Sequence, residues 1–294
     1  LKLLLAEASI KAEEPVEALA VLKSVPAKAG PPGQVDFLRG NALMLEGKLD
    51  EAAQSLSSAI SAQPRNVTYL STYAELETSQ KNYAGALSTL ARTARLQPRD
   101  PEFPYQMALV YVFMHRYAEA EESCRAAARI APDYSQAYYL LGAIEFDRGA
   151  AADAAAAFRR AEALKPSSAL CHAALGAALF RAGELVESEK ELNRALDLDP
   201  KTTSAYYWRA EVLAHRGANE KAIADLETFV ALDPQYPPAY ESLAQLYASE
   251  GQEAKAAAAR AKFAALKEKS PEQVPFFLAQ LGLARFRQTR TAAQ

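Results

Sequence analysis

Histidine and cysteine side chains most often supply the general bases, nucleophiles and metal ligands of enzymes. The sequence contains three histidines and two cysteines, which are His115, His172, His215, Cys124 and Cys171. No two histidines stand four residues apart, as a helical zinc site requires, and two cysteines are too few for a disulfide framework. Cys171 and His172 are adjacent, so on a helix they point about 100° apart and cannot act as a nucleophile and its base. We therefore expect no catalytic centre, no metal site and, since no glycine-rich phosphate loop is present, no bound cofactor.

These side chains have simpler expected roles. His115 and His215 fall next to predicted turns, where we expect a solvated ring. His172 takes a place that other segments of the chain give to an aromatic residue, so we expect its ring to pack in the core. Cys124 stands where other segments have a bulky apolar residue, which predicts a buried thiol that fills space.

Charge and hydropathy exclude several classes of protein. The net charge is −3 and the pI is about 5.8, whereas nucleic-acid-binding surfaces are usually strongly basic. No apolar run approaches the roughly 18 to 20 residues that span a bilayer. The opening Leu1–Leu5 run is too short, and too soon followed by charged residues, for a signal peptide. Because the sequence lacks an initial Met and looks truncated, a periplasmic or secreted location stays open beside the favoured cytoplasmic one.

The elements that carry these residues are predicted to be helices. Alanine, the best helix former, accounts for 64 of the 294 residues, against 12 glycines. The alternation of β-branched and aromatic residues that marks strands never lasts beyond a few positions. We therefore predict an all-α chain.

Six prolines divide the chain at a constant interval of 34 residues. They are Pro64, Pro98, Pro132, Pro166, Pro200 and Pro234. Each follows a predicted helix, which proline ends because it lacks an amide donor and clashes with the preceding turn. A constant period of this length predicts a solenoid of stacked helical repeats.

Other positions recur in the same frame. Small residues stand twelve and twenty-four residues before each proline, and a bulkier residue stands eight before it. The small residues are Gly40, Ala74, Ala108, Gly142, Gly176 and Ala210 on the first helix of each unit, and Ala52, Ala86, Ala120, Ala154, Ser188 and Ala222 on the second. Small side chains at fixed places let two helices cross at close range. Short segments such as Glu46-Gly47-Lys48 mark the turn between the two helices.

The 34-residue helix–turn–helix unit with these marks resembles the tetratricopeptide repeat (TPR). The best match is Leu141-Gly142 followed by Ala154, Phe158, Ala161 and Pro166. The resemblance implies an α-solenoid in which antiparallel helix pairs form a right-handed superhelix. It also implies a concave groove, lined by the first helix of each repeat, that binds a segment of another protein. Alanine-rich repeats with plain Leu-Asp-Pro endings look like bacterial members of the family.

In this frame the chain divides into four parts. Residues 1–32 are expected to form a truncated first repeat, and residues 33–270 seven tandem repeats of 34 residues. Residues 271–287 are expected to form a C-terminal capping helix that covers the last apolar face. Residues 288–294 are polar and are expected to form a frayed tail.

The groove predicted from the resemblance is aromatic. Family members often use Lys, Asn and Arg there to clamp the terminal carboxylate of a peptide, but here only Asn41 matches such a residue, so we do not expect a clamp. Aromatic rings line the middle of the groove instead, and Ala143, Ala173 and Ala177 are expected to leave hollows between them. A competing interpretation is that the rings pack against adjacent repeats. The candidate peptide-binding residues are Asn41, Tyr105, Leu109, Tyr139, Phe146, Phe180 and Tyr207.

The sequence therefore predicts a non-enzymatic scaffold that binds an extended or helical segment of another protein or a peptide. A second hypothesis is self-assembly, in which the apolar end left by the incomplete first repeat joins copies into a homo-oligomer. A third makes the chain the substrate-presenting region of a larger enzyme or of a secretion assembly. No nucleic acid and no membrane insertion are expected.

Overall fold

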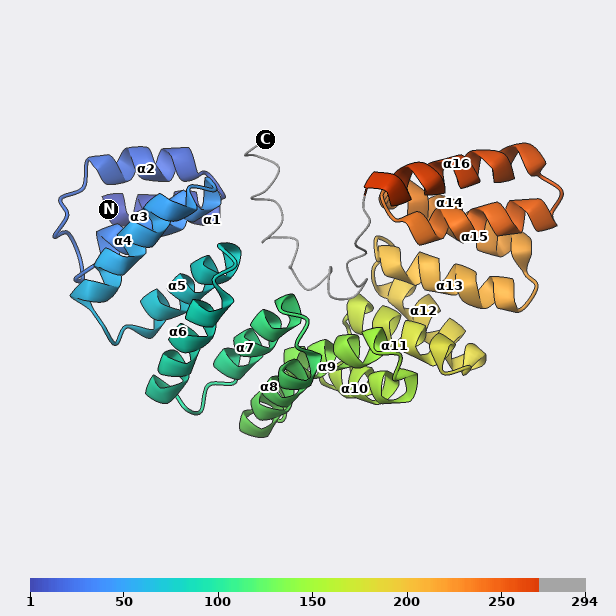
Figure 1. The fold of residues 1–294 in the computed structure, drawn as a ribbon, viewed down its shortest axis with the longest axis horizontal. Helices are drawn as coiled ribbons and strands as arrows, with labels where there is room; N and C mark the ends of the chain where they lie inside the picture. Colours follow the sequence, from blue (N-terminus) through green and yellow to red (C-terminus); the bar gives the residue numbers. More distant parts are fainter. Residues whose placement is uncertain (270–294) are drawn as a thin grey trace. The chain divides into compact units, whose positions relative to one another are not determined.

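The computed structural model describes residues 1–269, which form sixteen α-helices and no strand (Figure 1). This confirms the all-α class predicted from the sequence. None of the described helices is long and apolar enough to cross a bilayer. The expected capping helix at 271–287 and the tail at 288–294 lie outside the described residues. The helices are α1 (Lys2–Lys11), α2 (Pro15–Lys23), α3 (Gln34–Leu45), α4 (Leu49–Ala62), α5 (Val67–Ser79), α6 (Tyr83–Leu96), α7 (Glu102–Phe113), α8 (Tyr117–Ile130), α9 (Ser135–Asp147), α10 (Ala151–Leu164), α11 (Ala169–Arg181), α12 (Leu185–Leu198), α13 (Thr203–His215), α14 (Asn219–Leu232), α15 (Pro237–Ser249) and α16 (Glu253–Lys269).

The 34-residue period is visible in the helix boundaries. Seven second helices, from α4 to α16, begin at Leu49, Tyr83, Tyr117, Ala151, Leu185, Asn219 and Glu253. The turn before each contains a residue with positive φ, which is a glycine in five cases and Lys81 or His115 in the other two. His115 adopts a φ of 56°, a conformation that costs a residue with a side chain roughly 1 to 2 kcal/mol.

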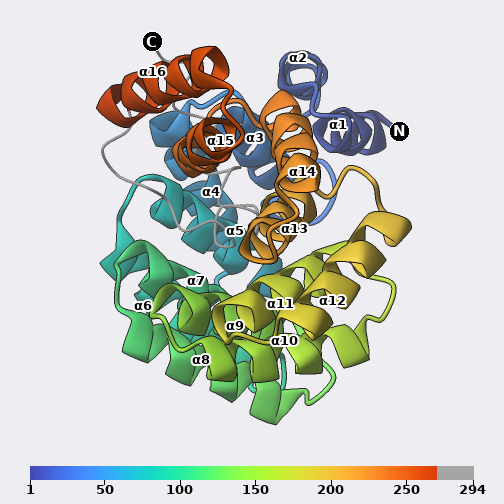
Figure 2. The ribbon, with the colours of Figure 1, turned by 90° about the vertical axis from the view of Figure 1, so that its right-hand side faces the viewer.

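The helices group into two compact units, which are described separately. The N-terminal unit comprises residues 1–132 and contains α1 to α8. The C-terminal unit begins at residue 133, and its described part contains α9 to α16. Within each unit, consecutive helices pair and each pair packs on the next (Figures 1 and 2). The sequence pattern runs through Pro132 without a change and does not predict this grouping.

The small residues of the repeat lie where the two helices of a pair cross. A methyl group added at Gly142 would stand 2.8 Å from the ring of Phe158, and one added at Gly176 would stand 2.6 Å from Cγ of Leu192. Phe158 and Leu192 are completely buried. The small residues of one helix therefore pack against the bulky residues of its partner, as the sequence predicts, and this packing holds each pair together.

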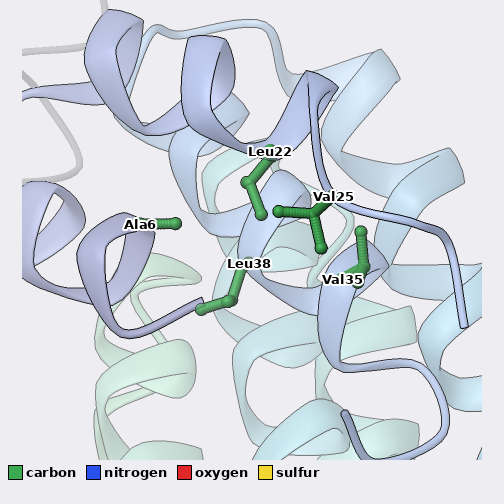
Figure 3. Packing of buried hydrophobic residues seen from close by; sticks show 5 residues of the cluster. All are labelled: Ala6, Leu22, Val25, Val35 and Leu38. Carbon is green, nitrogen blue, oxygen red and sulfur yellow. The ribbon is translucent and has the colours of Figure 1, made fainter. Parts of the chain in front are cut away.

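Adjacent pairs are joined by apolar residues that neither pair could bury alone (Figure 3). In the N-terminal unit, Leu22 of α2 and Val25 beyond its end lie against Val35 and Leu38 of α3, and Ala6 of α1 completes the cluster. Burying one large apolar side chain contributes about 1.5 to 3 kcal/mol. Each repeat therefore depends on its neighbour for stability.

Candidate functional site

Three of the candidate residues lie in the N-terminal unit. Asn41 is on α3, and Tyr105 and Leu109 are on α7. All three are half-buried. Burial raises the pKa of the Tyr105 phenol, so this hydroxyl stays protonated and able to donate a hydrogen bond.

The other four candidates lie on first helices of the C-terminal unit. Tyr139 and Phe146 are on α9, Phe180 is on α11 and Tyr207 is on α13. The ring of Tyr139 packs edge-on against Phe158, with centroids 5.3 Å apart, so it contacts the core of its own helix pair. The remaining three rings converge on one place.

That place is occupied by Trp208, which was not among the sequence candidates. The ring centroids of Phe146, Phe180 and Tyr207 lie 5.5, 6.0 and 5.0 Å from that of Trp208. We call these four residues the aromatic cluster. Aromatic pairs at such distances contribute about 0.5 to 1.5 kcal/mol beyond the area they bury. Trp208 is the single tryptophan of the sequence, so the cluster contains its own fluorescent reporter.

Most of the aromatic cluster is packed. Phe146 is 2% exposed, Trp208 5% and Tyr207 8%, whereas Phe180 is half-buried. Tyr139, outside the cluster, is 7% exposed. The burial of these rings is consistent with the competing interpretation, in which the rings pack against adjacent repeats. Phe180 is the most exposed ring of the cluster.

The hollows expected beside the rings are absent. Ala143, Ala173 and Ala177 are each 0% exposed. Neighbouring first helices, such as α11 and α13, pack directly on each other. Small side chains there bring the helices closer together and leave no space, so the expectation of hollows is wrong.

Arg181, the last residue of α11, adds a cation to the aromatic cluster. Its guanidinium carbon lies 3.9 Å from the ring centroid of Phe146 and 5.5 Å from that of Trp208. Its Nη1 donates a hydrogen bond to the carbonyl oxygen of Phe146 at 3.2 Å. The residue as a whole is exposed. A guanidinium carries five N–H donors, so Arg181 can also donate to a carbonyl or carboxylate of a ligand.

Asp147 follows Phe146 and lies in the field of this cation. Burial raises the pKa of the Asp147 carboxyl to about 7, and the positive charge of Arg181 opposes that rise. Its Oδ2 atom is buried and makes no hydrogen bond. This carboxyl therefore changes charge near neutral pH and has an acceptor that the surrounding side chains leave unused.

Polar side chains of α13 and α15 lie next to the aromatic cluster. The ring centroids of Tyr207 and Tyr236 are 5.2 Å apart, and Ser242 Oγ donates to Glu211 Oε1 at 2.6 Å. Burial raises the pKa of Tyr236 to about 12 and also raises the pKa of Glu211. We define the first-helix face as the aromatic cluster together with Asp147, Arg181, Glu211 and Tyr236.

The histidine and the cysteines considered for catalysis are buried in the fold, where they have structural roles. His172 is 5% exposed, and its Nδ1 lies 2.7 Å from Glu191 Oε2 while its Nε2 lies 3.1 Å from the carbonyl oxygen of Pro166. Cys124 and Cys171 are buried free thiols, and burial raises the pKa of both, which disfavours the reactive thiolate. Within residues 1–269 no group of three or more His, Cys, Asp or Glu side chains could hold a metal ion.

The other two histidines are exposed, as expected from their places near turns. His115 lies edge-on to Tyr117, with ring centroids 6.1 Å apart. His215 lies edge-on to Phe180 at 6.3 Å, at the border of the first-helix face.

Comparison with known families agrees with the repeat pattern. A family model described as tetratricopeptide repeat matches residues 105–169 and 173–237, and a second with the same description matches residues 43–103. The chain belongs to the tetratricopeptide repeat family. TPR repeats generally mediate protein–protein interaction, and the TPR fold is a non-enzymatic type of scaffold.

Solved structures with the same fold share little sequence with this TPR chain. One is the Cut9–Hcn1 hetero-tetramer of APC/C, with 17% identity and a TM-score of 0.63 over 82% of this chain and 48% of that one, so this chain spans about half of that relative. A TPR protein from Parabacteroides merdae ATCC 43184 has 19% identity and a TM-score of 0.60, over 83% and 96% of the two chains. YrrB, described as a TPR protein with an unusual peptide-binding site, has 22% identity and a TM-score of 0.51, over 65% and 98%. Comparison with curated proteins found no match.

Proposed function

We propose that the C-terminal unit binds an extended or helical peptide segment of another protein across its first-helix face. The observation that carries this proposal is Arg181, an exposed residue whose guanidinium is held over Phe146 and which directly follows the half-buried Phe180. Arg181 can donate to peptide carbonyl or carboxylate oxygens, while an apolar side chain of the peptide packs on Phe180. The similarity to YrrB, with its peptide-binding site, is consistent with this use of the fold.

The candidate residues have different roles in this proposal. Phe180 and Arg181 contact the peptide directly. Phe146 and Tyr207 are buried, so their part is to fix the position of the contact residues. Tyr139 supports α9 through its contact with Phe158. The half-buried Asn41, Tyr105 and Leu109 are proposed as peptide contacts of the N-terminal unit by itself.

A peptide-display selection followed by titration tests the proposal. A selected peptide should change the emission of Trp208 on binding to the wild-type chain, and the Phe180→Ala, Arg181→Ala double variant should bind it about 10- to 100-fold more weakly. Arg194→Ala is the matched control, because Arg194 is an exposed arginine on the second helix α12. Equal affinity of the wild-type chain and the double variant would overturn the assignment of this face.

A second candidate function is self-assembly through α1, and it rests on one difference in burial. Leu4 on α1 is 65% exposed, whereas Leu38, its equivalent on α3, is 4% exposed.

We propose that a second copy of the chain covers this side of α1. On α3 the same side is covered by Leu22 and Val25 (Figure 3), which indicates that α1 can receive an apolar surface of that kind. Light scattering over a range of protein concentrations should show a dimer for the wild-type chain and a monomer for Leu4→Glu. A wild-type chain that remains monomeric at high concentration would remove this candidate.

A further inference from the structure

The turns inside the helix pairs differ between the two units. In the C-terminal unit, each of the four described turns has a glycine at its residue with positive φ. In the N-terminal unit only one turn, at Gly47, follows this rule, and the first pair has Glu13 instead. The last two pairs of that unit have Lys81 and His115, with φ values of 61° and 56°. Glycine adopts this conformation without the steric cost of a side chain, so the chain keeps two strained residues that the turn itself does not require.

The side chains of Lys81 and His115 point to a use outside the fold, because both residues are exposed and the fold uses them little. Within the described part of the chain, the ammonium group of Lys81 makes no hydrogen bond or ion pair. The Nδ1 atom of His115 lies 3.3 Å from the hydroxyl oxygen of Tyr117. With the Tyr117 hydroxyl donating to Nδ1, the Nε2 atom carries the ring hydrogen and can donate it to a ligand.

Aromatic rings connect the two strained turns. Tyr83 stands two residues after Lys81, and Phe113 stands two residues before His115. Their rings are stacked, with centroids 6.2 Å apart and planes inclined by 5°, and α6 packs on α7 along the same contact. Both residues are half-buried, so part of each ring reaches the surface. We define the turn patch as Lys81, Tyr83, Phe113, His115 and Tyr117.

The charges around the turn patch favour an acidic ligand. Residues 79–83 and 113–117 contain one lysine, one arginine and one histidine, and no aspartate or glutamate. The arginine, Arg116, is already engaged, since its Nε donates to Glu119 at 2.8 Å and its guanidinium carbon lies 5.0 Å from the ring centroid of Tyr111. The Lys81 ammonium and the His115 imidazole are therefore the donors that a ligand can use. Carboxylates complement such donors, and an apolar side chain complements the rings beside them.

We propose that the turn patch of the N-terminal unit binds an acidic segment of a partner protein. The carboxylates of the segment pair with Lys81 and His115, and an aromatic or apolar side chain packs on the stacked rings of Tyr83 and Phe113. The turn patch shares no residue with the first-helix face, so it is a second recognition surface of the molecule. This role explains why these two turns keep side chains where the turns of the C-terminal unit have glycine.

The test uses the full chain and the double variant Lys81→Gly, His115→Gly. A displayed library of short random peptides is first depleted on the double variant and then selected on the wild-type chain. We expect the selected peptides to share aspartate or glutamate next to an aromatic or apolar residue. By fluorescence anisotropy, a labelled copy of one selected peptide should bind the double variant at least about 10-fold more weakly than the wild-type chain.

Two controls connect the binding to charge and to place. The same peptide with its acidic residues replaced by amides should bind the wild-type chain about 10-fold more weakly, and added salt should weaken the acidic peptide. Arg65→Gln, Arg99→Gln is the matched control variant, and it should bind the acidic peptide as tightly as the wild-type chain. These two exposed arginines stand in the turns that join successive pairs, at the other end of the helices.

Urea unfolding, followed by far-UV circular dichroism, separates recognition from a structural role. Because the two substitutions by glycine relieve backbone strain, the double variant should unfold at a higher urea concentration than the wild-type chain. A variant that gains stability and loses binding identifies side chains kept for recognition. A lower midpoint for the double variant would show that the two side chains stabilise their turns, and it would overturn the inference.

Two binding results would also overturn the inference. One is a selection that enriches no acidic peptide on the wild-type chain. The other is equal affinity of the selected peptide for the wild-type chain and the double variant. The proposed function rests on Phe180 and Arg181 of the C-terminal unit, so either result would refute the turn patch and leave that proposal standing.

Discussion

Asp147 provides a sharp test of the electrostatics of the first-helix face. Its carboxyl has an ordinary pKa of 3.8, which burial raises to about 7 in the folded chain. Between these two pH values the folded chain holds a proton that the unfolded chain has lost. The stability contributed by this proton is complete below pH 3.8 and is lost as the pH rises through 7. Asp147→Asn removes the charge and therefore removes this pH-dependent loss.

The size of the effect follows from the pKa difference. Each pH unit between the two pKa values is worth about 1.36 kcal/mol, so the wild-type chain loses at most about 2.7 kcal/mol from this group between pH 5 and pH 8. The side chain is partly exposed, and solvent screens part of its charge, which reduces the expected loss to about 1 to 2 kcal/mol. The asparagine side chain of the variant occupies nearly the same volume as the aspartate it replaces, so packing changes contribute equally at both pH values.

Urea unfolding at pH 5 and pH 8, followed by the fluorescence of Trp208, measures this difference. Relative to the wild-type chain, the free energy of unfolding of Asp147→Asn should rise by about 1 to 2 kcal/mol on going from pH 5 to pH 8. Asp153→Asn serves as the control, because Asp153 is exposed in the first turn of α10, and its difference from wild type should be the same at both pH values. A pH-independent difference for Asp147→Asn as well would refute the view that burial controls this carboxyl.

Two further predictions concern the scaffold, and urea unfolding measures both. Gly176→Ala should destabilise the C-terminal unit by about 1 to 3 kcal/mol, because the new methyl group would stand 2.6 Å from Cγ of Leu192; an unchanged midpoint would show that α11 and α12 can separate freely. Asp225→Ala should cost about 2 to 4 kcal/mol, because Arg209 donates to both carboxylate oxygens at 2.7 Å and would be left partly buried without them. Glu184→Ala, which removes an exposed ion pair, should cost less than about 1 kcal/mol, and equal losses for the two variants would contradict this distinction.

The fold could be predicted because its determinants are local and repeated. Proline after a helix, a small residue at a crossing and a turn residue with positive φ each act within one repeat. Gly142 and Phe158 illustrate this, since the sequence gives both the spacing and the difference in volume that the crossing needs. Seven repetitions of such a pattern leave little room for another fold. The division into two units at Pro132 changes none of these local rules, so the sequence does not contain a sign of it.

The candidate site was predicted only in part, because its openness depends on distances between neighbouring repeats. The sequence identified Phe146, Phe180 and Tyr207, which do lie together. It did not predict that α11 and α13 pack so closely that Ala173 and Ala177 are completely buried. It also missed Trp208, because an aromatic residue there looks like ordinary packing. Side-chain volumes along one helix do not determine the distance to the next helix.

A repeat protein nevertheless contains a signal that can find such residues, because its repeats form an alignment of the chain with itself. Positions that keep the same kind of residue in every repeat are required by the fold. At one position of the first helix, the four repeats of the C-terminal unit carry Asp147, Arg181, His215 and Ser249, which differ in charge and chemistry. Packing alone does not explain why one repeat position changes its charge from repeat to repeat. The structure places the first three of these residues on or beside the first-helix face. The variable positions within an otherwise regular repeat are therefore where recognition should be sought, and Asp147 and Arg181 could have been selected on that ground before Tyr139.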